Sequence, residues 1–330
     1  MGWRIRGKDA KLAAMRFRLF APIVIGASAA LAAVLGLHVE DGPTPQLAIE
    51  LDSVRLLATL SALAHDSMEG RAAGSAGSAR ARSFILERLA EAEVDPLGSG
   101  FEVPFELREG RGTGVNLVAL VPGVDASPYI VLSAHYDHVG IRDGQIYNGA
   151  DDNASGTALA LELARALRSA PMRHPVILAL FDAEEGGLRG ARHFVAEPPV
   201  PLAEIALNVN MDMVARAAGV LWAGGTFHTP ALRPVLEAVA NEAPLALRLG
   251  HDRPGAPEGD DWTTQSDHGA FHAAGIPFVY FGVEDHPDYH RPTDDFEAVN
   301  PADFVAVART VLAALRALDA ALPLSPPEAP

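Results

Sequence analysis

Residues 156–185 have the sequence GTALALELARALRSAPMRHPVILALFDAEE, and this stretch decides the fold class. Leucines and alanines at helical spacing predict a helix over residues 156–169, and the unbroken apolar run 176–181 predicts a strand. A strand that is apolar on both faces is typical of a sheet covered by helices on each side. The run ends in the acidic segment DAEE, so carboxylates directly follow the strand.

Further strands and helices are expected on both sides of this unit, and they alternate from residue 129 onward. Further strands are expected at residues 101–107, 115–121, 129–134, 205–210, 220–223 and 278–281, and further helices at 47–64, 78–92, 188–195, 230–242, 269–274 and 301–322. Strands that alternate with helices imply an α/β fold in three layers, with a mostly parallel central sheet and helices on both faces. We expect one catalytic domain over residues 47–322, because no gap between motifs is long enough for an inserted domain.

Composition limits the classes of function. The chain has 330 residues, 49% of them apolar, and a formal net charge of −16, so it can bury a large core and lacks the basic face that nucleic acid requires. It contains no cysteine, which excludes disulfides, thiolate metal ligands, a cysteine nucleophile and a lipoprotein-type acyl anchor.

The amino-terminal region has the pattern of an export signal. Residues 1–18 are basic, and residues 19–37 (LFAPIVIGASAALAAVLGL) are free of charge. About 20 apolar residues span a bilayer, so this segment is expected to be a transmembrane signal-anchor or a cleaved signal peptide. The arginines on its near side predict that the amino terminus stays cytoplasmic and that the rest is exported, either membrane-anchored in the cell envelope or secreted. Residues 38–46 form a linker and residues 323–330 a proline-rich tail.

Candidate ligands occur in five short segments at the ends of apolar runs. His135 and Asp137 follow one predicted strand, Glu184 and Glu185 a second, and Asp212 a third. The remaining two segments carry Asp152, which precedes a predicted helix, and His290. Side chains that follow successive strands of an open α/β sheet converge at its carboxyl edge.

Each of these segments has a plain explanation when taken alone. An acidic residue before a helix is usually a cap, and paired glutamates in a loop are usually solvated. Together, however, several carboxylates and two histidines at one sheet edge would repel one another, or be costly to desolvate, unless divalent cations neutralised them. Imidazole and carboxylate ligands without thiolate suit Zn²⁺, with Mn²⁺ or Co²⁺ as substitutes.

With these motifs in this order, the chain resembles the co-catalytic di-zinc aminopeptidases, a family of secreted bacterial leucyl aminopeptidases related to glutamate carboxypeptidase and glutaminyl cyclase. The resemblance covers about residues 47–322 and implies the zinc-exopeptidase fold. It implies two zinc ions per chain, one bound by His135 and Asp212, the other by Glu185 and His290, with Asp152 bridging both. It also implies a cis peptide bond between Asp152 and Asn153.

The remaining motif carboxylates receive catalytic roles. Asp137 would orient the imidazole of His135 through its second nitrogen. Glu184 has no metal in this assignment, so it can take the proton of the attacking water and pass it to the leaving amine as general base and acid. The resemblance thus implies an aminopeptidase that acts on peptides with a free amino terminus.

Other residues near the motifs have weaker assignments. Asp267 and His268, in the segment SDH, would contact substrate or support the ligands, as would Tyr289 beside His290. Asp294 could also support the ligands. Three further polar residues near motifs receive no role: His138, Arg216 and His286.

Several alternatives remain at this point. The chain has no Gly-x-Ser-x-Gly nucleophile elbow and no His-Glu-x-x-His zinc motif. A glutaminyl-cyclase-like or carboxypeptidase-like zinc enzyme of the same fold stays open. So does a membrane-tethered binding ectodomain that has kept the peptidase fold without catalysis. Side-chain specificity and oligomeric state cannot be read from the sequence.

Overall fold

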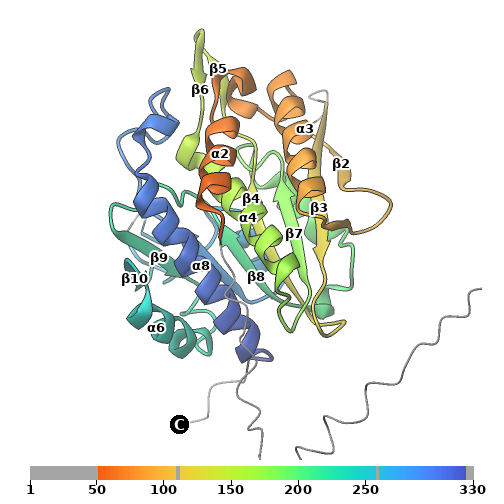
Figure 1. Cartoon of the computed structure of the whole chain (residues 1–330), viewed down its shortest axis with the longest axis vertical. Coiled ribbons are helices and arrows are strands. Elements are labelled where there is room, and N and C mark those ends of the chain that lie inside the picture. Colours follow the sequence, from red (N-terminus) through yellow and green to blue (C-terminus); the bar gives the residue numbers. More distant parts are fainter. Residues whose placement is uncertain (1–50, 109–111, 258–259, 325–330) are drawn as a thin grey trace, which may run out of the picture. The chain divides into compact units, whose positions relative to one another are not determined.

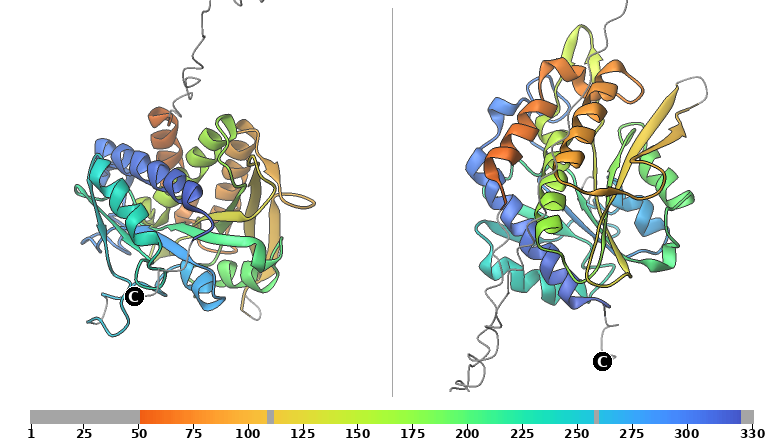
Figure 2. Two further views of the ribbon diagram at one scale, coloured as in Figure 1. Left: turned by 90° about the horizontal axis from the view of Figure 1, so that it is seen from below. Right: turned by 45° about the vertical axis from the view of Figure 1, so that its right-hand side comes forward.

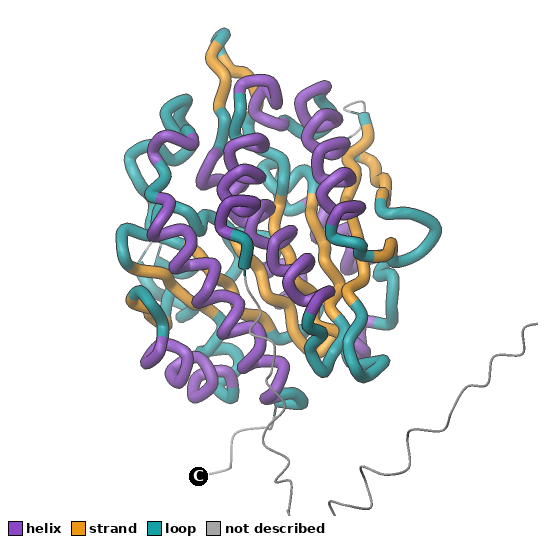
Figure 3. The backbone as a smooth tube through the Cα atoms, in the orientation of Figure 1, coloured by secondary structure: helices purple, strands orange, loops and turns teal. Residues whose placement is uncertain are grey.

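The computed structural model describes residues 51–108, 112–257 and 260–324. Within them the backbone forms a nine-stranded sheet flanked by helices, shown in Figure 1 and, coloured by secondary structure, in Figure 3. The strands in spatial order are β1 (Asp95–Pro96), β3 (Thr113–Val121), β7 (Val176–Phe181), β4 (Tyr129–His135), β8 (Ile205–Met211), β11 (Phe278–Gly282), β9 (Val220–Gly224) and β10 (Ala246–Leu249), with β2 (Glu102–Glu106) paired to β3.

The centre of this sheet is parallel. β7, β4, β8 and β11 are neighbours that run the same way, with Ser133 of β4 opposite Ala179 of β7 and Asn210 of β8. At the flanks, β3 is antiparallel to β7 and β9 is antiparallel to β11. The expected α/β class is confirmed, but the sheet is mixed and is parallel mainly at its centre.

Two short connections explain the antiparallel flanks. β3 leads to β4 through residues 122–128, and β8 leads to β9 through residues 212–219, with no helix in either connection. A parallel crossover needs about a dozen residues or more, so each of these connections reverses the chain direction. The sequence-based prediction inferred a mostly parallel sheet from the strand–helix alternation that follows residue 134, and it therefore overestimated the parallel share.

Helices cover both faces of the sheet, as expected. One face packs against the helices that lie in front of the sheet in Figure 1: α2 (Ser53–Leu63), α3 (Ala76–Glu91), α4 (Gly156–Ser169), α6 (Leu232–Glu242) and α8 (Pro301–Ala321). The other face packs against α5 (Arg189–Ala196) and α7 (His268–Ala273), and the left view of Figure 2 shows the sheet between the two helical layers. Ile130 and Leu132 of β4 belong to the first core and Val131 to the second, because successive side chains of a strand alternate between faces.

The ends of the predicted elements differ from the structure by a few residues. In the described residues α2 begins at Ser53, because the carboxylate of Asp52 caps it by accepting a hydrogen bond from the Arg55 backbone N–H at 3.0 Å. Four strands were not predicted, namely β10, the two-residue β1, and the separate hairpin of β5 (Gly140–Arg142) and β6 (Gln145–Tyr147). Each is too short to display a periodic pattern. Short helical turns complete the fold: η1 (Asp66–Arg71), η2 (Ala150–Ser155), η3 (Leu202–Glu204) and η4 (Phe296–Ala298).

The expected signal or anchor segment, residues 19–37, lies outside the described residues, as do the leader, the linker and most of the tail. In the part of the chain that the structure describes, no helix combines the length and the apolar character needed to cross a bilayer.

Hydrogen bonds of Asp319 connect the end of α8 to the loop before β7. Its buried carboxylate accepts hydrogen bonds from the backbone N–H groups of Arg173 and His174, each at 2.9 Å, and lies 2.9 Å from Nδ1 of His174. Asp319→Ala leaves these donors without an acceptor, so it should lower the free energy of unfolding by about 1–3 kcal/mol in denaturant titration. Arg309→Ala, exposed on the same helix, should change it by less than about 0.5 kcal/mol. Equal effects of the two substitutions would contradict this role.

Candidate metal centre

The motif residues meet at the carboxyl edge of the parallel strands. His135 is the last residue of β4, Glu184 and Glu185 lie in the loop after β7, and Asp212 directly follows β8. Since β7, β4 and β8 are parallel neighbours, their ends meet at one edge. Asp152 reaches the same place from η2.

Four side chains at this edge form a first group of potential ligands. One ligand atom from each residue lies within 4.8 Å of the others; the members are His138, Asp152, Glu185 and His290. Nε2 of His290 lies 2.9 Å from Oδ2 of Asp152 and 3.2 Å from Oε1 of Glu185. Nδ1 of His138 lies 2.8 Å from the same Glu185 oxygen.

A second group lies beside the first and contains His135, Glu184 and Asp212. Nε2 of His135 is 3.2 Å from Oδ1 of Asp212 and 4.0 Å from Oε2 of Glu184. The same nitrogen is 3.4 Å from Oδ1 of Asp152, whose other oxygen faces the first group. Asp152 therefore presents one oxygen to each group, which is the arrangement of a bridging ligand.

Asp137 lies behind both His135 and the Glu184 loop. Its Oδ1 is 3.6 Å from Nδ1 of His135 and accepts a hydrogen bond of 3.0 Å from the backbone N–H of Glu184. Asp137 is buried, so these two neighbours fix its orientation. It is thus placed to hold the imidazole with Nε2 toward the site.

Several polar groups hold the loop that carries Asp152. The Asp152–Asn153 peptide bond is cis, as the resemblance implied. The carboxylate of Asp294 accepts hydrogen bonds from the backbone N–H groups of Asp151 and Asp152 at 3.1 Å. The Asn153 side chain donates to the carbonyl of Met211 at 2.9 Å, which ties the loop to the end of β8. The expected supporting role of Asp294 agrees with these contacts.

Arg71 also holds the loop that carries Asp152, through hydrogen bonds to the segment that precedes it. Its side chain is fully buried and donates to backbone carbonyl oxygens at 2.6–2.9 Å, those of Leu63, Tyr136, Asn148 and Gly149. Burial lowers the pKa of Arg71 to about 10, so the guanidinium remains charged at neutral pH. A buried cation thus joins the segment after His135 to the segment before Asp152.

Replacing Arg71 by lysine should weaken zinc binding, because a lysine cannot donate to all these carbonyls in the planar arrangement of a guanidinium. We expect the zinc Kd to rise about 10- to 100-fold, the effect typical of lost support behind metal ligands. Competition with a fluorescent zinc chelator measures it. Arg80→Lys, at an exposed ion pair with Glu69, is the control. An unchanged Kd for Arg71→Lys would refute the role.

Three residues with weaker assignments lie around the site. Asp267 and His268 are both fully buried, and Nε2 of His268 lies 2.8 Å from the carbonyl oxygen of Trp262. Their burial does not support direct contact with substrate. Burial raises the pKa of Asp267 to about 8 and lowers that of His268 to about 4. Tyr289 stacks on His290 with ring centroids 4.0 Å apart.

The carboxylates of the cluster favour the protonated form of two of its imidazoles. Burial opposes protonation of His135, but Asp212 and Glu184 outweigh it and raise the pKa well above its usual value. Hydrogen bonds to Asp152 and Glu185 raise the pKa of His290 to about 10. Burial raises the pKa of Glu184 well above the usual range. A divalent cation would replace the protons on the imidazoles, which is how metal binding is coupled to pH.

The residues present fit a metal ion. Nε2 of His138 is buried without a hydrogen-bond partner among the described residues, and Nδ1 of His138 and Oε1 of Glu185 are buried beside other potential ligands. Buried polar atoms are costly unless something pairs with them, and here they face the other potential ligands of the first group. The donors are imidazole nitrogens and carboxylate oxygens, which suit zinc.

His138 was missed as a candidate ligand at the sequence level. It is the fourth residue of the segment His135-Tyr-Asp-His, and no role was assigned to it. The loop after β4 turns so that His135 and His138 both face the site, each toward a different group. Similarly, His286 received no role, and its Nε2 lies 3.2 Å from Oδ2 of Asp151, the residue before Asp152. Loop geometry that no periodicity predicts decides both positions.

Comparison with known proteins places these observations in a family. The segment matched by aminopeptidase YwaD of Bacillus subtilis is 32% identical over 182 residues, which is 52% of this chain and 37% of that protein. The chain therefore spans well under half the length of this relative.

Solved structures share the fold. A zinc aminopeptidase from Bacillus subtilis superposes with a TM-score of 0.65 at 18% identity, covering 81% of this chain and 95% of that one. A glutaminyl cyclase from Porphyromonas gingivalis gives the same TM-score of 0.65, also at 18% identity, with coverage of 80% and 98%. These two likenesses concern the fold alone. The model of peptidase family M28 matches residues 116–315, most of the described domain, and the chain belongs to this family.

Proposed function

We propose that the described domain is a zinc aminopeptidase that removes the amino-terminal residue from peptides. The observation that carries this proposal is the position of Asp152, with one oxygen toward His135 and the other toward His290. Membership of the M28 family and the similarity to aminopeptidase YwaD support the reaction class.

In this proposal two zinc ions occupy adjacent sites. One is held by His135 and Asp212, the other by Glu185 and His290, and Asp152 bridges them. The geometry adds His138 as a further candidate ligand of the second ion, because its Nδ1 lies 2.8 Å from Oε1 of Glu185. When bound, the ions polarise the scissile carbonyl and lower the pKa of the attacking water.

Side chains of the protein transfer the proton of the attacking water. Glu184 belongs to the second group, and its backbone N–H donates a hydrogen bond of 3.0 Å to Asp137. We assign Glu184 as the general base that accepts the proton of the water and then donates it to the leaving amine. Asp137 keeps the imidazole of His135 in place during both transfers.

An assay with paired substrates tests the reaction class. The purified chain should hydrolyse leucine anilide, be inhibited by a chelator, recover on addition of zinc, and be inactive on the same anilide with a blocked amine. Cleavage of blocked substrates alone would overturn the aminopeptidase proposal. Release of the carboxy-terminal residue would favour a carboxypeptidase, cyclisation of amino-terminal glutamine would favour a glutaminyl cyclase, and binding without turnover would favour a non-catalytic ectodomain.

We also propose that residues 19–37 direct export of the domain at 47–322. The support is the charge-free apolar run after a basic leader. Cell fractionation of a tagged chain tests this. Recovery with the membrane fraction indicates an anchor, recovery from the medium or periplasm indicates cleavage, and recovery only from the cytosol would contradict export.

A further inference from the structure

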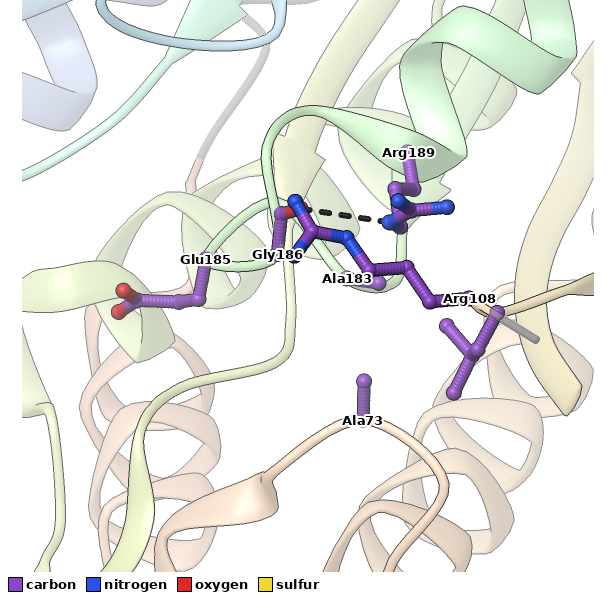
Figure 4. A pocket seen from close by; sticks show the side chains of 7 residues that line it. Ala73, Arg108, Ala183, Glu185, Gly186 and Arg189 are labelled. Atoms are coloured by element: carbon purple, nitrogen blue, oxygen red, sulfur yellow. Dashed lines mark hydrogen bonds between the residues drawn. The ribbon is translucent and has the colours of Figure 1, made fainter. Parts of the chain in front are cut away.

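A cavity of about 420 Å³ lies beside the metal centre, with Glu185 in its wall. Its other lining residues come from the loop after β7 and the start of α5, from the end of β2, and from the segment after η1: Ala73, Leu107, Arg108, Ala183, Gly186 and Arg189. Figure 4 shows this cavity at close range. Its contact with a proposed zinc ligand makes it a candidate substrate subsite.

Two arginines, Arg108 and Arg189, line the cavity. In Figure 4 the side chains of Arg108 and Arg189 both reach toward the Gly186 segment, whereas the carboxylate of Glu185 points away from them. Nε of Arg189 donates to the carbonyl of Gly186 at 3.3 Å. This hydrogen bond orients the Arg189 side chain.

Neither guanidinium is neutralised by the part of the chain that the structure describes. Several arginines there pair with a carboxylate, for example Arg216 with Asp288 at 2.6 Å, but no ion pair among the described residues includes Arg108 or Arg189. Like charges that approach the same segment repel each other unless an anion lies between them. In a chain of net charge −16, two such arginines beside an acidic metal site indicate a site for an external anion.

The remaining wall of the cavity is apolar. Leu107 and Ala183 are buried and form a small apolar cluster with Phe105, against which Ala73 packs. A ligand for this cavity therefore carries an aliphatic portion as well as a negative charge. A guanidinium presents paired donors that match the two oxygens of a carboxylate.

We propose that this cavity is a carboxylate subsite, in which Arg108 and Arg189 bind an acidic group of the peptide substrate next to the scissile bond. The inference rests on the proposed function, because it names the substrate class of the same site. The carboxylate has two sources, an acidic side chain or the free carboxyl terminus of a dipeptide. Both present the same group to the arginines.

Kinetics with three substrate pairs tests the proposal and separates the sources. Glutamyl anilide against glutaminyl anilide reports a side chain on the first residue, and Leu-Glu-amide against Leu-Gln-amide reports one on the second. Leu-Leu against Leu-Leu-amide reports the carboxyl terminus. In at least one pair the wild-type chain should prefer the carboxylate form about tenfold or more in kcat/KM, as a charge-assisted contact allows.

The variant Arg108→Gln with Arg189→Gln should reduce that ratio to within about twofold of one, while cleavage of the neutral partner stays within about twofold of wild type. Each single variant should reduce the ratio in part. Arg192→Gln, an exposed arginine one turn along α5 that does not line this cavity, is the matched control and should keep the ratio. Ratios near one in all wild-type pairs, or a preference that survives the double substitution, would overturn the subsite.

Failure of the proposed function can be told apart from failure of the subsite. If the neutral substrates are not cleaved, the aminopeptidase proposal fails, and calorimetric titration decides the subsite independently. The zinc-loaded Glu184→Gln chain is titrated with the same compounds. The subsite is supported if a carboxylate form binds more tightly than its neutral partner and the two arginine substitutions remove this difference. Equal binding of the two forms overturns the subsite.

Discussion

Glu184→Gln should lower kcat about 10²- to 10⁴-fold, the range attributed to general base catalysis, and leave KM for leucine anilide within a fewfold of wild type. Glutamine has nearly the same shape but cannot accept the proton of the attacking water. Glu184 is largely buried, and its Oε2 lies 4.0 Å from Nε2 of His135, on the side of the ring that faces Asp152 and Asp212. Asp137, the other carboxylate without an assigned metal, lies at the opposite nitrogen, Nδ1. Steady-state kinetics on the purified variant measures the effect.

The metal content of the same variant decides between two roles for Glu184. Its carboxylate belongs to the group of His135 and Asp212, so the geometry also suits a ligand. If Glu184 is the base, Glu184→Gln keeps the zinc content of the wild type, whereas loss of zinc together with activity would identify it as a ligand. Glu204→Gln, at an exposed residue at the opposite end of β8 from Asp212, controls for the charge change. Activity within tenfold of wild type would refute both roles.

Asp152→Asn should remove most of the zinc and reduce kcat/KM by about 10³-fold or more. The two oxygens of Asp152 face different groups, at 3.4 Å from Nε2 of His135 and 2.9 Å from Nε2 of His290. An amide has only one oxygen and carries no charge, so it cannot bridge two cations. With fewer cations bound, the repulsion among the remaining carboxylates would be screened less effectively. Metal analysis after dialysis, combined with the anilide assay, measures both losses.

The control variant makes the same change of charge at a residue outside the two groups of potential ligands. Asp143→Asn lies in the exposed turn between β5 and β6 and should retain both zinc and activity. An Asp152→Asn chain that still binds two zinc ions after dialysis would contradict the bridging assignment. Circular dichroism on both variants shows whether a loss reflects unfolding.

Much of this fold follows from sequence patterns. The run 176–181 became β7, buried throughout, because a fully apolar segment of that length has no solvent-facing side. The positions of His135, Glu184, Glu185 and Asp212 at one edge follow from parallel strands whose ends coincide. These predictions depend only on local periodicity and on one rule of sheet topology.

Other features depend on tertiary structure that periodicity does not encode. His138 faces the first group because of how the loop after β4 turns, and Arg71 is buried because four carbonyls from distant segments surround it. In sequence, Arg71 resembles any loop arginine. The cavity beside Glu185 likewise joins residues from separate parts of the chain, so its pair of arginines emerges only in the fold.

The central claim is that Asp152 joins two adjacent metal sites in one chain, and the zinc stoichiometry of the purified protein tests it most directly. Elemental analysis after zinc loading and removal of free metal should give about two zinc ions per chain, falling to none with a strong chelator. A wild-type chain that is folded yet retains no zinc, or that saturates at a single ion, would contradict the claim.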